Sequence, residues 1–489
     1  MSSELSKEKA ERVVEAFRKA LGVYENINAC GNSELSGFLR GLSGAYIEPG
    51  PSGSITRGKV EVLPTGRNFF AVDPSSLPTK SAWKVGVETA EKLLEHYIEK
   101  HGRYPETVGE VLWSIDAYKA DGEQLAQILY LLGVRPNGRS LEVIPLEELG
   151  RPRIDVSVRI SGILRDTLPN YIQMIDEAVT KVLMLDEPPE MNFARKHYLE
   201  QLRKLSELGI SGDFAKCRIW GPPPGAYGAG VNYAVEASAW QKDEDLANVW
   251  VQWSAYGYTR DFYGRKAVEA FLLNLKTVDV VTRNHPSDEH DLTNCCGYFA
   301  QHGGFYATVK QLNGEVEICI TDTTDLSETK VREIKDEIER IARAKILNPL
   351  WIEEMKKHGY RGANEFSKKI LHLYGWSATT RLVDDWIFEE IAEKYVLDEE
   401  MRKFFEENNV YALEEIARRL IEAKERGIWN AKEDQLRRLR EIYGEIEGIL
   451  EDEVTGDVQG SEVEFLSPQD VEEWRENISD VLKAWRLVK

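Results

Sequence analysis

Short apolar segments alternate with helical patterns between residues 85 and 184, and this alternation constrains the fold more than any other feature of the chain. Three segments have the length and apolar content of buried strands: residues 107–114 (TVGEVLWS), 141–146 (LEVIPL) and 154–160 (IDVSVRI). The segments around them have helical periodicity: residues 85–100, 122–133 and 169–184. Strands separated by helices are typical of a largely parallel sheet, so we predict an α/β layer.

The strand at residues 154–160 carries polar side chains on one of its two faces. Apolar residues occupy every second position from Ile154 to Ile160, and Asp155, Ser157 and Arg159 lie between them. Because successive side chains of a strand point to opposite faces, the polar residues share one face. We therefore predict that this face is not plain hydrophobic core.

The remainder of the chain is predicted to be mainly helical, with one small β insertion. Residues 1–45 have a helical pattern, and a connection rich in Pro, Gly and Ser follows up to about residue 83. Residues 190–275 and the region after residue 326 are also helical in pattern. Two strand-like runs flank Asn313-Gly314, a pair typical of a β-hairpin turn.

The fold class is thus a parallel-type α/β layer followed by a large helical region with a small hairpin or sheet insertion. The expected division is into residues 1–60, 61–190, 191–330 and 331–489.

Composition excludes several functional classes. A net charge of −21 argues against nucleic acid or an anionic membrane as the main partner. No run of about 18 apolar residues occurs, so no membrane span is expected, and the charged amino terminus lacks the apolar core of a signal peptide. Five cysteines, two of them adjacent, do not form a disulfide framework, so we expect a reduced, cytoplasmic protein.

One segment has the spacing of a phosphate-binding loop. Residues 53–60 (GSITRGKV) match G-x-x-x-x-G-K, but Val60 stands where a hydroxyl would hold Mg²⁺. The residues before it do not form a buried strand pattern. We therefore interpret the segment as an ordinary loop and do not expect this chain to hydrolyse ATP itself.

Residues 284–304 (NHPSDEHDLTNCCGYFAQHGG) concentrate side chains that bind metals. The ligand-type residues are His285, Asp288, Glu289, His290, Asp291, Cys295, Cys296 and His302. No pair has the spacing of a zinc finger, since adjacent cysteines do not form a C-x-x-C hook. Both a functional loop and a merely polar connection remain open. The other five histidines lie in helical, charged surroundings, where surface or helix-packing roles are expected.

Two further segments carry candidate residues. In residues 221–240 (GPPPGAYGAGVNYAVEASAW), Glu236 is expected in the first turns of a helix, with Trp240 on the same face. A pocket wall and a structural loop are both possible there. Arg165 and Asp166 follow the strand that ends at Ile160, where α/β sheets bind ligands. They form either part of a pocket or a local ion pair.

Several segments together resemble the large subunit of the tetrapyrrole metal chelatases, the family of cobaltochelatase CobN and the magnesium chelatase H subunit. The segments are VLPTGRNFFAVDPSSLPT, IPLEELGRPRIDVSVRISGILRDTLPNYIQMIDEAV, EPPEMNFARKH, PPGAYGAGVNYAVE, EHD followed by QHGGFYATV, NPLWIEEMKKHGYRGANE and GWSATTRLVDDWIFEEIAEKYV. The resemblance runs from about residue 45 to about residue 450. It covers only the carboxy-terminal part of the family's chains, less than half of their length.

The resemblance implies a tetrapyrrole substrate, insertion of a divalent metal, and ATP hydrolysis by separate AAA+ subunits. Another chain that supplies the front portion is a further expected partner. The specific expectation is insertion of Co²⁺ into a corrin precursor in cobalamin biosynthesis. A magnesium or nickel chelatase subunit, and a non-catalytic tetrapyrrole-binding or scaffold protein, are the alternatives.

The resemblance also suggests roles for particular residues. Glu289, His290 and Asp291 match the EHD of cobalt-type relatives, and magnesium-type relatives lack this histidine. Imidazole suits Co²⁺ or Ni²⁺ better than Mg²⁺, so cobalt is favoured. The expected catalytic residues are Glu289, His290, Asp291 and Glu236, and the expected metal ligands are His290, Glu289, His285 and His302. The expected substrate-binding residues are Arg159, Arg165, Asp166, Tyr227, Asn232 and Trp240. One departure is LTNCCGY (292–298), where cobalt-type relatives have an acidic LDSDDY.

Overall fold

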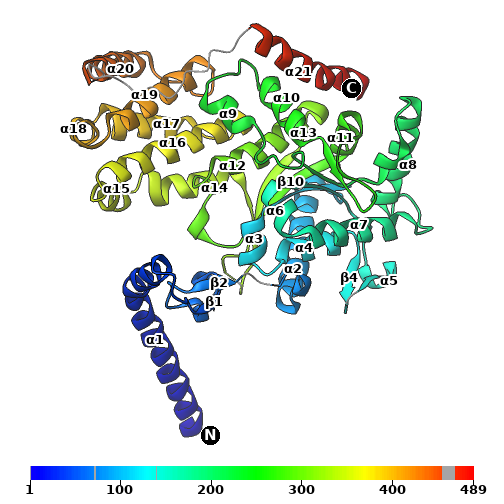
Figure 1. Cartoon of the computed structure of the whole chain (residues 1–489). Coiled ribbons are helices and arrows are strands. Elements are labelled where there is room, and N and C mark those ends of the chain that lie inside the picture. Colours follow the sequence, from blue (N-terminus) through cyan, green and yellow to red (C-terminus); the bar gives the residue numbers. More distant parts are fainter. Residues whose placement is uncertain (1, 71–72, 139, 326, 454–467, 489) are drawn as a thin grey trace.

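The computed structural model describes residues 2–70, 73–138, 140–325, 327–453 and 468–488. A sheet lies in the middle of the molecule, and the carboxy-terminal helices form a layered block beside it (Figure 1). The first helix, α1 (Ser2–Leu42), projects away from this body. No described helix is both long enough and apolar enough to cross a lipid bilayer.

The central sheet has eight strands in the order β12-β11-β10-β3-β6-β7-β8-β9. The strands are β3 (Thr107–Leu112), β6 (Asp155–Ile160), β7 (Ile219–Gly221), β8 (Tyr256–Tyr258), β9 (Tyr263–Lys266), β10 (Val278–His285), β11 (Glu317–Asp322) and β12 (Lys330–Glu333). The five strands from β11 to β7 are parallel, and β12, β8 and β9 join the edges antiparallel. The predicted α/β class is therefore confirmed.

The other elements surround this sheet. Two small two-stranded sheets are made by β1 (Pro49–Pro51) with β2 (Asn68–Phe70) and by β4 (Val134–Asn137) with β5 (Ser140–Val143). The helices up to β10 are α2 (Lys80–His101), α3 (Ser114–Lys119), α4 (Glu123–Leu131), α5 (Leu146–Leu149), α6 (Gly162–Thr167), α7 (Pro169–Leu183), α8 (Phe193–Glu207), α9 (Val231–Glu236), α10 (Asp243–Ser254) and α11 (Val268–Leu275).

The later helices are α12 (Cys296–Tyr298), α13 (Gly304–Asn313), α14 (Ile334–Ile341), α15 (Pro349–Lys356), α16 (Tyr360–Thr380), α17 (Asp385–Ile391), α18 (Glu399–Asn408), α19 (Val410–Glu425), α20 (Glu433–Glu453) and α21 (Pro468–Val488). A π-helical segment, Phe299–Gly303, joins α12 to α13 into one continuous helix.

The strand order reverses between β3 and β10. From β3 the chain continues to β6 and β7 on one side, whereas β10 and β11 lie on the other side. The helices that follow these two strands cover opposite faces, because α4 packs in one hydrophobic core with Val108 while α13 packs in the other with Val281. Loops that leave toward opposite faces open a crevice at the carboxyl ends of the strands, the usual ligand site of such sheets.

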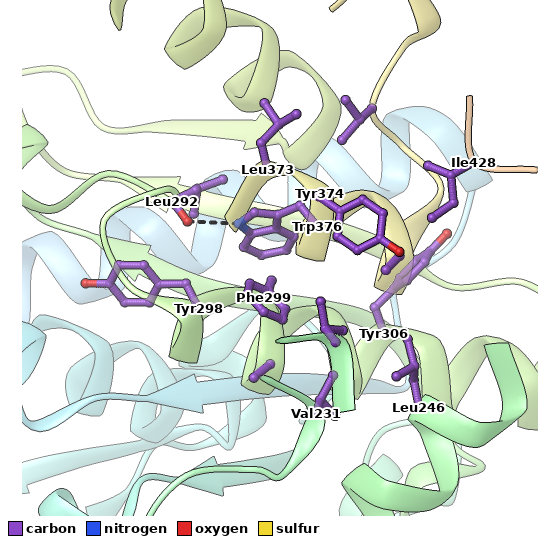
Figure 2. Packing of buried hydrophobic residues seen from close by; sticks show 14 of the residues in the cluster. Val231, Leu246, Leu292, Tyr298, Phe299, Tyr306, Leu373, Tyr374, Trp376 and Ile428 are labelled. Atoms are coloured by element: carbon purple, nitrogen blue, oxygen red, sulfur yellow. Dashed lines mark hydrogen bonds between the residues drawn. The ribbon is translucent and has the colours of Figure 1, made fainter. Parts of the chain in front are cut away.

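The core under the crevice is built around α16. Trp376 and Phe299 pack together there, and the indole N–H of Trp376 donates a hydrogen bond to the carbonyl of Leu292, at 2.9 Å (Figure 2). Two glycines allow this close packing. A Cβ atom at Gly303 would lie 2.2 Å from Thr379 Oγ1, and one at Gly375 would lie 2.5 Å from the ring of Phe299.

The predicted β-hairpin around Asn313-Gly314 is wrong. Residues 304–313 form α13, and Gly314, with φ of 80°, ends that helix. β11 pairs parallel with β10 instead of with the segment before it. Asn-Gly favours positive φ both in hairpin turns and at helix ends, so the pair alone did not distinguish them.

Two other predictions need correction. Residues 190–275 include β7, β8 and β9 in addition to helices, and these strands are only three or four residues long, too short to show alternation. The strand predicted at 141–146 is β5, which pairs antiparallel with β4 outside the central sheet.

The polar face predicted for residues 154–160 is confirmed, and it is fully buried. Asp155 pairs with Arg218 at 2.8 Å, and the hydroxyl of Ser157 donates to Asn274 at 2.7 Å. His197, expected in a surface or helix-packing role, is buried and bonds Asp155 at 3.0 Å. The four-part division of the chain stays a prediction, although strands on both sides of residue 190 share the central sheet.

Candidate functional site

The candidate site lies at the carboxyl ends of the parallel strands. The loop after β3 contributes α3, and the loop after β10 contributes residues 286–295. These two loops flank the reversal of strand order. Residues 53–59, far away in the sequence, lie against both of them through the contacts of Ser54, Thr56 and Arg57.

Glu289 is held by three donors. Its carboxylate accepts hydrogen bonds from Ser54 Oγ at 2.7 Å and Thr56 Oγ1 at 2.9 Å, and it pairs with Lys119 Nζ at 2.7 Å. Burial alone would raise the pKa of Glu289, but these partners outweigh it and hold the pKa at about 2. Glu289 is therefore ionised and firmly positioned at neutral pH.

His290, the next residue, has a side chain without any hydrogen bond or ion pair to the residues that the structure describes. The imidazole is half-buried. Burial and the positive charge of Lys119 lower the pKa of His290 below its usual value. The ring is thus neutral near pH 7, and its unprotonated nitrogen is available for a proton or a metal ion.

Asp291 lies behind the loop and anchors it. Its buried carboxylate pairs with Lys345 and Lys369 and accepts hydrogen bonds from the hydroxyl and the amide of Thr293. Burial favours the neutral acid, but the two lysines outweigh this and hold the pKa at about 2. His372, expected to be a surface or packing residue, also supports the loop, because its Nδ1 bonds the carbonyl of Thr293 at 2.6 Å.

His285 belongs to a compact cluster with Asp288 and Glu337. Within the described ranges, this is the only group of three or more histidine, cysteine or carboxylate side chains whose ligand atoms lie within 4.8 Å of one another. Arg340 already bridges it, donating to Asp288 at 2.6 Å and to Glu337 at 2.7 Å. The carboxylates of this cluster are therefore neutralised by the protein itself.

The structure does not bring His302 to the other histidines. It lies within the π-helical segment, fully buried, with Nε2 3.4 Å from the carbonyl of Val281 and its ring against Trp376. Burial lowers the pKa of His302 to about 3. Its burial suits a packing role, in contrast to the metal ligand expected from the sequence.

Glu236, at the end of α9, is linked electrostatically to the site loop. Its carboxylate interacts electrostatically with Cys296, the neighbour of Cys295. Burial raises the pKa of Glu236 above its usual range, although Cys296 and Arg419 lower it in part. The neighbouring thiol of Cys296 lowers the pKa of Cys295 to about 6, and Cys295 in turn raises the pKa of Cys296.

A buried arginine connects the two loops of the crevice. Arg283 of β10 pairs with Asp116 of α3 at 2.9 Å and stacks on the ring of Tyr298 at 3.8 Å. Its two terminal nitrogens have no hydrogen-bond partner among the described residues. It interacts electrostatically with both Cys295 and His290.

The two arginines expected to bind substrate instead hold the Pro/Gly-rich loop after β7. Arg159 is buried and donates to the carbonyl of Gly228 at 3.0 Å, while Arg165 donates to the carbonyl of Pro223 at 2.6 Å. Arg165 also pairs with Asp166 at 2.7 Å, so the local ion pair foreseen as one alternative is present. Their donors are occupied, and Asp166 in turn accepts a hydrogen bond from Tyr227 at 2.7 Å.

Asn232 and Trp240 flank Glu236 at a distance from these contacts. Asn232 is buried within α9. The expectation that Trp240 continues the helix of Glu236 is wrong, because α9 ends at Glu236 and Ser238 turns the chain with φ of 53°. Trp240 is buried against the guanidinium of Arg426, 4.2 Å from the ring centre.

Several residues of the site were not foreseen. They are Ser54, Thr56, Asp116, Lys119, Arg283, Lys345 and Lys369. The only signal was the G-x-x-x-x-G-K spacing, which marks a loop whose residues Ser54 and Thr56 contact Glu289. The arrangement presents the imidazole of His290, which has no partner in the described part of the chain, and the carboxylate of Glu236, whose pKa is raised.

Comparison with known proteins identifies relatives over most of the chain. The family model CobN/Magnesium Chelatase matches residues 2–436. An uncharacterized protein of Methanocaldococcus jannaschii is 51% identical over 445 residues, which cover 89% of this chain and 36% of that protein. The aerobic cobaltochelatase subunit CobN of Pseudomonas aeruginosa is 38% identical over 419 residues, or 83% of this chain and 34% of that protein.

A solved structure shares the fold. The catalytic subunit of cobaltochelatase from Mycobacterium tuberculosis superposes with a TM-score of 0.83 at 39% identity, covering 86% of this chain and 37% of that chain. This chain thus spans about a third of the length of the relatives that it matches. With a fold and a sequence that both match over more than four fifths of its length, the chain belongs to the CobN/magnesium chelatase family.

Proposed function

We propose that this chain is the carboxy-terminal, catalytic part of an ATP-dependent cobaltochelatase large subunit, which inserts Co²⁺ into a corrin-precursor tetrapyrrole in cobalamin biosynthesis. Family membership and the names of the cobaltochelatase relatives support this proposal. The observation that carries it is the imidazole of His290 at the crevice of the sheet, which is neutral and has no partner among the described residues.

Metal insertion requires two exchanges. The hydrated ion must lose water, and two pyrrole N–H protons must leave the macrocycle as the ion enters it. The imidazole of His290 is suited to replace water on Co²⁺, because imidazole nitrogen prefers Co²⁺ or Ni²⁺ to Mg²⁺. Glu289 lies beside it as a fixed negative charge, and Lys119 balances that charge.

Glu236 is suited to accept a proton. A carboxylate with a raised pKa is a better base at neutral pH than an ordinary glutamate, because its affinity for the proton is closer to that of the group it deprotonates. Asp291 acts indirectly in this proposal: with Lys345 and Lys369 it fixes the loop that carries Glu289 and His290.

The proposal assigns ATP hydrolysis to partner subunits of the AAA+ class. Further polypeptide, equivalent to the rest of the family's length, would complete the tetrapyrrole cavity. We place the reaction in the cytoplasm, in keeping with five cysteines that are all unpaired in the described structure.

Reconstitution tests the proposal directly. The chain is combined with its AAA+ partners, ATP and a hydrogenobyrinate-type substrate, and absorbance changes report insertion of Co²⁺, Ni²⁺ or Mg²⁺. We expect insertion with Co²⁺ that is lost in His290→Ala and retained in His101→Ala. His101 is the control because it lies beside Glu317, at the amino end of β11, whereas His290 follows the carboxyl end of β10.

Other outcomes select the alternatives. Insertion of Mg²⁺ but not Co²⁺ would identify a magnesium chelatase subunit, the second activity that the family name includes. Tight tetrapyrrole binding without insertion of any metal would identify a non-catalytic binding protein. Either result contradicts the cobaltochelatase proposal.

A further inference from the structure

We propose that a cavity between α15, α16 and the loop after β10 binds a carboxylate side chain of the tetrapyrrole, with Arg361 as its main partner. This inference deepens the proposed function and rests on it for the identity of the ligand. The cavity measures about 470 Å³, in the range of small-molecule sites, and Asn294, Lys345, Trp351 and Arg361 help to line it. Most of the lining comes from residues 348–365, which the metal-insertion steps above do not use.

Carboxylates of the substrate need cationic partners, and the two arginines expected in this role are occupied. Arg159 and Arg165 donate to carbonyls of the loop after β7. Arg361, in contrast, is exposed in the first turn of α16 and has no hydrogen bond or ion pair to the residues that the structure describes. Its planar guanidinium is therefore free to hold a carboxylate through two parallel N–H bonds.

The lining of the cavity is basic although the chain as a whole is acidic. The net charge of the chain is −21, yet the described lining places Lys345, Lys369 and Arg361 against the carboxylate of Glu365. Lys345 and Lys369 both pair with Asp291, and Lys369 also lies 3.8 Å from Glu365. The two carboxylates thus balance the two lysines, which leaves the charge of Arg361 uncompensated.

A flat apolar wall stands beside these cations. The half-buried ring of Trp351 packs edge-on against Phe366, with ring centres 5.5 Å apart, so that its orientation is fixed. The two helices approach closely because a Cβ atom at Gly362 would lie 2.0 Å from the carbonyl oxygen of Met355. Since aromatic faces stack well on other flat rings, the cavity offers charge and a flat surface to the same ligand.

The cavity and His290 share one loop. Asn294, in the lining, follows His290 by four residues, so their Cα atoms lie at most ~14 Å apart. Lys369 donates to the side-chain oxygen of Asn294 at 3.0 Å, and the side-chain amide of Asn294 donates to the carbonyl of Glu289 at 3.4 Å. These bonds fix the loop between the two places, so a large planar ligand can put a carboxylate at Arg361 and its ring beside His290.

The test is tetrapyrrole binding to the chain in complex with its partner subunits, without metal. The probes are a hydrogenobyrinate-type free acid and the full methyl ester of the same ring, which keeps the flat surface and removes the negative charge. Quenching of tryptophan fluorescence reports the affinity. Arg361→Gln should weaken binding of the free acid on the order of ten- to a hundredfold and leave binding of the ester unchanged.

Three further variants sharpen the comparison. Arg361→Lys should give an intermediate affinity for the free acid, because lysine keeps the charge but loses the planar fork. Trp351→Leu should weaken binding of the acid and the ester alike, because both use the flat wall. Arg437→Gln, at an arginine of α20 whose side chain is 72% exposed, is the matched control and should change neither.

The outcomes separate this inference from the proposed function. Equal affinity of wild type and Arg361→Gln for the free acid, an equal loss with the ester, or no binding of the free acid by the wild-type complex would overturn the inference. Insertion of Co²⁺ together with an unchanged free-acid affinity in Arg361→Gln contradicts only the inference. Free-acid binding that depends on Arg361, in a complex that inserts no Co²⁺, contradicts only the proposed function.

Discussion

Glu110 provides a quantitative test of how the sheet buries charge. It lies on β3, beside the reversal of strand order, and is completely buried. Its carboxyl oxygens face the amides of Gln124 at 2.7 Å and Gln127 at 3.0 Å, and no cation pairs with it in the described structure. Burial raises the pKa of Glu110 to about 8, and the two amides lower it only in part. At neutral pH the folded protein therefore keeps Glu110 mostly protonated.

The magnitude follows from the difference between the folded and unfolded pKa. In the unfolded chain the carboxyl has its ordinary pKa of 4.5, against about 8 in the fold. Between these values the folded state binds more protons than the unfolded state, so the free energy of unfolding falls as pH rises. At about 1.4 kcal/mol per pH unit, the cost is below ~1 kcal/mol at pH 5 and about 3 kcal/mol at pH 7.

Glu110→Gln removes this cost because an amide does not ionise. The hydrogen bonds can be kept, since Gln124 Oε1 has no partner in the described structure and a turn of that amide lets it accept from the new side chain. We expect the variant to match the wild type near pH 4.5 and to be more stable by about 3 kcal/mol at pH 7. Urea denaturation at several pH values measures the difference, with Glu147→Gln, at an exposed glutamate of α5, as the control. A stability difference that does not grow with pH, or a variant less stable at pH 7, would refute the reasoning.

Three further predictions follow from the same contacts. Gly303→Ala forces a methyl group into α16 and should cost about 1–3 kcal/mol of stability, whereas Gly448→Ala, which meets nothing within 4 Å, should cost none; thermal melting compares the two. Asp155→Asn leaves a buried arginine unpaired and should cost about 3–5 kcal/mol, seen as a lower urea midpoint, and an unchanged midpoint would contradict the buried ion pair. Glu289→Gln weakens the contact with residues 53–59, so amide hydrogen exchange in that segment should accelerate while exchange in the central strands stays the same.

The sequence predicted the regular part of the fold because periodicity there reflects burial directly. The strand at 107–112 was found because it lies in a short apolar segment, and the helix at 169–183 because its apolar residues repeat at the helical period. The strands β7, β8 and β9 were missed because three or four residues show no period. Asn313-Gly314 was misassigned because the same positive φ serves a hairpin and a helix end.

The site was predictable in composition but not in geometry. Residue types singled out Glu289, His290 and Glu236, and the family resemblance agreed with them. Nothing in the local sequence indicated that Arg159 and Arg165 would donate hydrogen bonds to the loop after β7. Those bonds depend on the path that the chain takes after this strand. Docking of residues 53–59 onto Glu289 likewise joins positions more than 230 apart in the sequence, which no periodicity encodes.

The most direct test of the central claim is chemical rescue of His290→Ala in the reconstituted system. If a free imidazole at this position supplies the metal ligand, the variant should bind tetrapyrrole normally but insert Co²⁺ much more slowly, and added imidazole should restore much of the rate. The same addition should leave the wild type and His101→Ala unaffected. Insertion by His290→Ala at the wild-type rate, or a loss that imidazole does not reverse while tetrapyrrole binding is intact, would contradict the account.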